Sequence, residues 1–162
     1  MAENSFIFQD FLLEVDPHYQ WFALQIQDLM QQNGCKLKMM LAKNGYVVSY
    51  SHGKKNRVIM NFVFRKNGLV TRIYGDHVVE YLDFLDSLPD NMRQTIEKAP
   101  NCKRFESPPR CSPRCVGYVF SIKGAQYQKC RYSCFFFEVN DDSIPYIKTF
   151  LEKELLSRNA ST

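Results

Sequence analysis

The sequence predicts an α+β fold, a single domain in which helices pack on one face of an antiparallel sheet. Two observations predict it. Apolar residues recur at three- and four-residue spacing near both ends of the chain, but at two-residue spacing between residues 36 and 74. Apolar side chains make up 45% and aromatic ones 14% of the 162 residues, which is enough for a hydrophobic core. The expected order of elements is ααββββααββα over residues 1–157, followed by a frayed tail at 158–162.

Two helices are expected before the sheet. Residues 5–14 form the first, with aromatic side chains on one side. Asp16 and Pro17 favour the start of the second, because aspartate accepts a hydrogen bond from the first turn and proline lacks an N–H that would be unsatisfied there. Gly34 is typical of a helix C-terminus, so the second helix should end at this residue.

A four-stranded antiparallel meander should follow. Its strands are expected at residues 36–42, 45–51, 57–65 and 69–74. Asn44-Gly45 and Asn67-Gly68 favour tight hairpin turns, since both residues of such a turn need positive φ. Strict alternation in the third strand places Val58, Met60, Phe62 and Phe64 on one face, and Arg57, Asn61 and Arg65 on the other.

The second half of the chain should add three helices and a hairpin. The helices are expected at residues 77–87, 90–99 and 144–157. Before the last of them, the sequence predicts a hairpin with strands at 116–122 and 132–139 and a turn near Lys123-Gly124. This hairpin belongs to a subregion, residues 102–139, that contains five of the six cysteines.

This order of elements resembles the YdhG-like family of small bacterial domains. The resemblance covers residues 8–100: paired N-terminal helices, a meander with Lys-Asn-Gly turns, and a helix pair broken at Leu88-Pro89. Some members are described as frataxin-like iron chaperones, so the resemblance implies an acidic iron-binding surface. The chain departs from that pattern, because no carboxylate lies between Asp28 and Asp76. No catalytic residue is carried over from the family.

Charge is distributed in blocks, although the formal net charge is only +4. Residues 36–75 contain nine basic residues and no acidic one, so the sheet face without helices should be positive. Basic groups attract phosphates and exposed aromatic rings stack on bases. The predicted anion or nucleic-acid contacts are Lys36, Lys38, Arg57, Arg65 and Arg72. Two alternatives stay open, a small anionic ligand held against the sheet and a solvated face that the acidic helices balance.

Four cysteines form two pairs with three residues inside each pair and fourteen residues between the pairs. A hairpin would bring such pairs together, as in zinc sites with four cysteine ligands. The sequence therefore predicts a structural zinc site at Cys111, Cys115, Cys130 and Cys134, with Cys102 as an alternative ligand. Three other interpretations stay open: reduced core thiols, a redox pair, and an iron–sulfur cluster.

Other features limit the class of protein. Nucleotide-binding and hydrolase motifs are absent, and the three histidines share no ligand spacing, so nothing indicates an enzyme. The chain shows no signal peptide and no apolar stretch long enough for a bilayer, which predicts a cytoplasmic protein without membrane contact. We therefore expect a small soluble binding module with a structural zinc site. The alternatives are a nucleic-acid-binding regulator that uses the basic sheet face, and an uncharacterised enzyme or small-ligand carrier.

Overall fold

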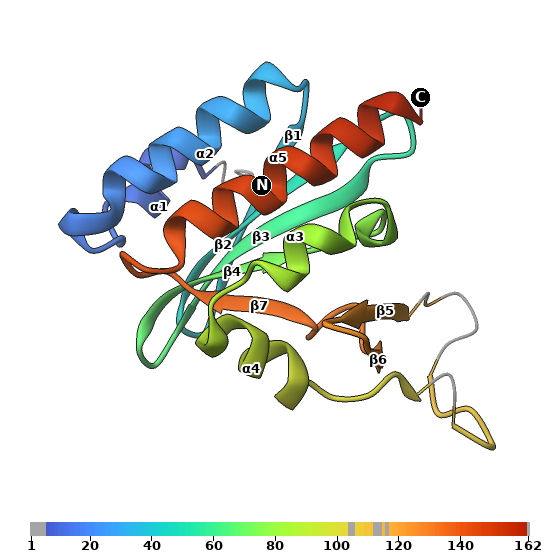
Figure 1. Cartoon of the computed structure of the whole chain (residues 1–162). Helices are drawn as coiled ribbons and strands as arrows, with labels where there is room; N and C mark the ends of the chain where they lie inside the picture. Colours follow the sequence, from blue (N-terminus) through green and yellow to red (C-terminus); the bar gives the residue numbers. More distant parts are fainter. Residues whose placement is uncertain (1–5, 104–105, 112–114, 116, 162) are drawn as a thin grey trace.

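The computed structural model describes residues 6–103, 106–111, 115 and 117–161. It confirms the α+β class: helices accompany a five-stranded antiparallel sheet and a separate two-stranded hairpin (Figure 1). The α-helices are α1 (Phe8–Leu12), α2 (Gln20–Gln32), α3 (Leu82–Asp86), α4 (Asp90–Lys98) and α5 (Ile144–Ala160). The strands are β1 (Lys36–Ala42), β2 (Gly45–His52), β3 (Arg57–Arg65), β4 (Gly68–Ile73), β5 (Tyr118–Ile122), β6 (Ala125–Lys129) and β7 (Phe135–Glu138).

The second helical segment begins where the sequence predicts, whereas α1 covers only Phe8–Leu12 of the predicted 5–14. The Asp16 carboxylate accepts a hydrogen bond of 2.9 Å from the N–H of His18, and Pro17 opens a 3₁₀ turn that continues into α2. Phe11 of α1 and Phe22 of α2 are fully buried. Their rings contact Phe62 of β3 at centroid distances of 5.5 and 6.1 Å. These contacts attach both helices to one face of the sheet.

The five-stranded sheet has the order β1-β2-β3-β4-β7. Its first four strands are the predicted meander. Gly45 and Gly68 have φ values of 135° and 116°, which explains the glycines in the two Asn-Gly turns. The fifth strand, β7, pairs with β4 in a register that places Phe137 opposite Thr71.

The predicted pairing of 116–122 with 132–139 is wrong. β5 pairs with β6 across Lys123 and Gly124, which both have positive φ, and the segment at 132–139 contributes β7 to the large sheet. The cause is the difference between the two candidate strands. β6 is polar and mostly exposed, which suits a two-stranded hairpin, whereas Phe135 and Phe137 need a core.

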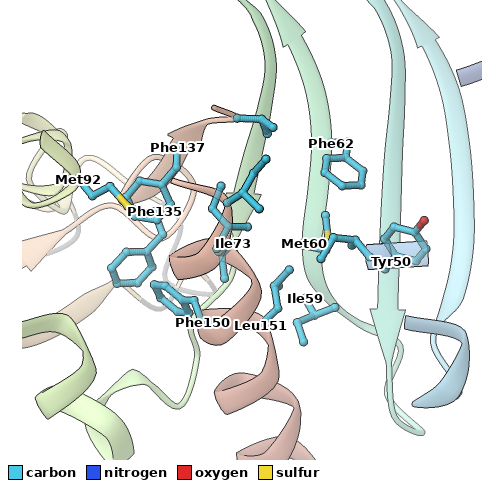
Figure 2. Packing of buried hydrophobic residues seen from close by; sticks show 14 of the residues in the cluster. Tyr50, Ile59, Met60, Phe62, Ile73, Met92, Phe135, Phe137, Phe150 and Leu151 are labelled. Carbon is cyan, nitrogen blue, oxygen red and sulfur yellow. The ribbon is translucent and has the colours of Figure 1, made fainter. Parts of the chain in front are cut away.

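That core lies between the sheet and α5, as Figure 2 shows. The Phe150 ring of α5 lies 4.8 Å from Phe135 and 5.5 Å from Phe84, centroid to centroid. Gly75 follows β4 at this point, and a Cβ there would lie 3.1 Å from both Phe135 and Phe150. A side chain at position 75 would therefore require these rings to shift by a few tenths of an ångström.

The last helix is longer than predicted. It continues to Ala160, so the expected frayed tail at 158–162 is wrong for residues 158–160. The reason is Arg158, which is 5% exposed and donates hydrogen bonds of 3.0–3.1 Å to the carbonyls of Arg57, Val58 and Tyr74. Among the described residues, no helix is both long and apolar enough to cross a bilayer.

Candidate functional site

The cysteine-rich subregion is built on β6. After α4, Asn101 pairs with Lys129, the Cys102 N–H donates to the carbonyl of Gln128, and the Cys130 N–H donates to that of Pro100, both at 3.0 Å. Residues 100–102 therefore lie along β6 like a short additional strand. This pairing brings Cys102 to the end of the hairpin where Cys130 begins the next turn.

A buried lysine holds this arrangement to α4. The Lys129 side chain is 5% exposed, and its Nζ donates to the carbonyls of Glu97 and Ala99 and to Oδ1 of Asn101, at 2.8–3.1 Å. Carbonyls at a helix C-terminus carry partial negative charge, so the ammonium group is compensated without a carboxylate. The position of residues 99–101 relative to β6 is thereby fixed.

Gly117 permits a close approach between Cys102 and β5. A Cβ at Gly117 would overlap the sulfur of Cys102, and it would lie 2.8 Å from the Cβ of that residue. The Cys102 side chain therefore lies directly against the backbone two residues after Cys115. Any larger residue at position 117 would push Cys102 away from this position.

Four thiols influence one another here. Burial raises the pKa of the Cys115 thiol, and so does its hydrogen bond with Cys111. The thiolate charges of Cys102 and Cys130 raise that pKa further. The hydrogen bond places the Cys111 and Cys115 thiols in contact, and charge effects, which act over longer distances, link Cys102 and Cys130 to this pair. We refer to Cys102, Cys111, Cys115 and Cys130 as the thiol cluster.

Three of the four predicted zinc ligands belong to the thiol cluster. Cys134 is not among the groups that raise the pKa of Cys115, although the charge of Cys130 raises the pKa of Cys134 itself. Cys134 is fully buried in the hydrophobic core, where burial raises its thiol pKa well above the ordinary value. Its N–H donates to the carbonyl of Cys130 at 2.9 Å, so the two residues share a turn. Cys35, at the end of α2, is away from the cluster. Within the described part of the chain, no three Cys, His, Asp or Glu side chains are already arranged to hold a metal ion.

A second group of polar residues, which sequence reasoning missed, surrounds Asp76. Its carboxylate accepts hydrogen bonds from the guanidinium groups of three arginines and from a tyrosine hydroxyl, at 2.8–3.2 Å. These donors are Arg57, Arg131, Arg158 and Tyr118. Burial by itself would raise the pKa of Asp76, but the hydrogen bond and charge of Arg131 and the other donors lower it to about 2.

Glu154 of α5 lies behind Asp76 and is fully buried. Its carboxylate accepts hydrogen bonds from Nε of Arg158 at 2.8 Å and from the hydroxyl of Tyr81 at 2.5 Å. The backbone N–H of His77 donates to it at 3.0 Å, and Nδ1 of the same residue lies 2.8 Å away. Because Arg158 contacts both carboxylates, Asp76 and Glu154 form one network, the charged cluster. Its residues come from β3, the segment at 76–81 after β4, β5, the turn after β6, and α5, so no single stretch of sequence indicates it.

Asp76 should make the stability depend on pH. Its folded pKa of about 2 lies below the ordinary value of 3.8, so its contribution is present above pH 4 and is lost as the pH falls toward 2. After allowance for partial exposure, that contribution is about 2 kcal/mol. We expect Asp76→Asn to destabilise the protein by about this much more at pH 6 than at pH 2 in urea unfolding. Asp83→Asn, on an exposed face of α3, is the control, and an equal pH response of both variants would contradict the assignment.

The five predicted anion contacts do not share one surface. Lys36, Lys38 and Arg65 are exposed on the sheet face opposite α5, and Arg72 lies on the same face but is 5% exposed. Arg57 instead joins the charged cluster on the helix side, opposite His52. The reason is a bulge: Tyr50 pairs with Met60 but Ser51 pairs with Val58. One extra residue in β3 shifts the alternation that predicted the position of Arg57.

On the face opposite α5, a row of paired residues crosses all five strands: Lys38, Ser49, Asn61, Arg72 and Phe136. The Arg72 guanidinium lies 3.7 Å from the centroid of the Tyr132 ring and donates to Oδ1 of Asn61 at 3.1 Å. Tyr132 thus covers the most central cation of this face. The predicted nucleic-acid surface is reduced to scattered exposed lysines and Arg65.

Comparison with known proteins adds no relative: neither a family model, nor a curated protein, nor a solved structure matches the chain. The resemblance of residues 8–100 to the YdhG-like family therefore stays a prediction.

Proposed function

We propose that the protein is a small binding module whose C-terminal subregion is organised by one structural zinc ion. The observation that supports the proposal is that Cys102, Cys111 and Cys130 all raise the pKa of Cys115, while the backbone holds Cys102 and Cys130 on adjacent paired segments. Four thiolates complete the tetrahedral coordination of zinc and leave no position for substrate. Zinc at such a site stabilises structure and does not catalyse a reaction.

The outer part of the subregion has few core contacts of its own. β5 places Tyr118, Phe120 and Ile122 in the hydrophobic core, whereas β6 is mostly exposed, and so are residues 106–110 before Cys111. Thiolate coordination of structural zinc contributes on the order of 10 kcal/mol in small peptides and would stabilise this outer part.

Four thiolates around one Zn²⁺ carry a net charge of about −2. Arg110, Lys129 and Arg131 lie next to the ligands in the sequence, although each of them also contacts another acceptor: Glu106, the carbonyls after α4, and Asp76, respectively. Cys111 is exposed and follows an exposed loop, so it is the ligand that can move to close the coordination sphere. The proposal includes a reducing, cytoplasmic compartment, in which thiols stay available for the metal.

Metal analysis tests the proposal. Protein purified without chelator should contain about one zinc per chain, and cobalt substitution should give the intense absorption of a tetrahedral thiolate site. Cys35→Ser, away from the thiol cluster, is the control and should retain the metal. Less than about 0.2 zinc per chain after growth with added zinc would remove the proposal. Stoichiometric iron, or a disulfide between Cys111 and Cys115, would replace it with a cluster or a redox pair.

A further inference from the structure

A pocket of about 380 Å³ opens beside the charged cluster, where the turn between β2 and β3 meets the end of α5. Its size falls within the range of small-molecule sites. Most of the charged or ionisable side chains that line it are basic: His52, Lys54, Lys55, Arg57, His77 and Arg158. Among the described lining residues, Asp76 is the only carboxylate. We refer to this space as the basic pocket.

The charge of Asp76 is already compensated. Three guanidinium groups donate to its carboxylate, and Glu154 behind it accepts from Arg158 and contacts His77. The C-terminal end of α5 adds only about half a negative charge. The basic pocket therefore keeps a positive potential that its own residues do not neutralise.

Lys54 and Lys55 are the cations available for a ligand. Both are exposed in the turn from Gly53 to Asn56, which a hydrogen bond of 3.1 Å between the Asn56 N–H and the Gly53 carbonyl closes. In the part of the chain that the structure describes, neither lysine forms an ion pair. Arg57 stands next to them, and its side chain is 53% exposed although it contacts Asp76.

The two histidines are held in place by side-chain contacts. Nε2 of His52 lies 2.7 Å from Oδ1 of Asn159, and Nδ1 of His77 lies 2.8 Å from Oε2 of Glu154. Each contact holds its ring in one orientation at the wall of the basic pocket.

We propose that the basic pocket binds a small phosphate monoester. A monoester carries a charge of about −1.5 to −2 at neutral pH, which matches the two unpaired lysines with help from Arg57. The pocket is larger than a phosphate group alone, so it has room for an organic body against the aliphatic parts of the lysine and arginine side chains. The inference does not depend on the zinc proposal, because no cysteine lines the basic pocket.

Calorimetric titration of the full chain tests the inference with three probes: adenosine 5′-monophosphate, adenosine and inorganic phosphate. We expect saturable binding of the nucleotide, no detectable binding of adenosine, and weaker binding of phosphate because it lacks the organic body. The double variant K54Q/K55Q should weaken nucleotide binding at least about tenfold. K36Q/K38Q makes the same charge change at exposed positions on β1 and should leave the affinity within about twofold.

Three outcomes would overturn the inference. Absence of saturable nucleotide binding at low ionic strength removes the site. If both double variants weaken nucleotide binding equally, the loss comes from the change in net charge and not from the basic pocket. Adenosine or inorganic phosphate binding as tightly as the nucleotide excludes a phosphate-monoester site. All four lysines are exposed, and thermal unfolding of both variants verifies that each one is folded.

Discussion

Replacing Glu154 by glutamine is expected to destabilise the protein by about 3–5 kcal/mol. Glu154 is fully buried and faces donors from Arg158, Tyr81 and His77. Glutamine keeps the size of the side chain, but its amide would turn donor hydrogens toward these donors and leave the Arg158 charge with less compensation. A loss of this size is a large share of the stability of a typical domain.

Urea unfolding followed by circular dichroism measures this effect. Glu152→Gln is the matched control, because it makes the same chemical change at an exposed position on the same helix. It should alter the free energy of unfolding by less than about 0.5 kcal/mol. A double-mutant cycle with Arg158→Met should show strong coupling, since both residues belong to the charged cluster. Additive effects, or similar losses for the two glutamine variants, would contradict the assigned role of Glu154.

Local patterns were sufficient to predict most of the fold. Period-two runs bounded by Asn-Gly located all four strands of the meander, and the Asp16-Pro17 start located the turn that leads into α2. The fifth strand could not be placed in this way. An aromatic run at 135–137 shows that a strand needs a core, but not which strand will be its neighbour.

The assumption that side chains alternate strictly between the two sheet faces also caused the wrong placement of Arg57. Two-residue periodicity holds only while both paired strands advance together. The bulge that pairs Ser51 with Val58 is set by how the two strands meet in space, and no residue pattern in the sequence indicates it. The same bulge carries Arg57 to the charged cluster, and thereby to the basic pocket.

The charged cluster connects the cysteine-rich subregion to the rest of the domain. Arg131 directly follows Cys130, and Tyr118 begins β5, yet both donate to Asp76 at 2.8–2.9 Å. Zinc bound at the thiol cluster would therefore order the residues that hold Asp76 in place. This connection could not be predicted, because its members lie 42 and 55 residues from Asp76 in the sequence.

The spacing of the cysteines predicted a metal site, but spacing alone selects as ligands those cysteines that occur in pairs along the sequence. Cys102 lies outside any pair, and only the bridge between Asn101 and Lys129 and the missing side chain of Gly117 reveal its position. Cys134 completes a pair in the sequence, but the neighbouring Phe135 carries it into the core. We therefore propose Cys102 as the fourth ligand, where the spacing favours Cys134.

Zinc content of two matched variants tests the ligand set, and with it the proposed function, most directly. Cys102 and Cys134 are both buried, so replacement by alanine makes the same change in a similar environment, with a packing loss of about 1 kcal/mol at each. After dialysis against a competing chelator, Cys102→Ala should lose most of its zinc, because three thiolates bind the ion more weakly than four. Cys134→Ala should retain about one zinc per chain. Retention of zinc by Cys102→Ala together with its loss from Cys134→Ala would contradict the account and restore the ligand set that the cysteine spacing predicts.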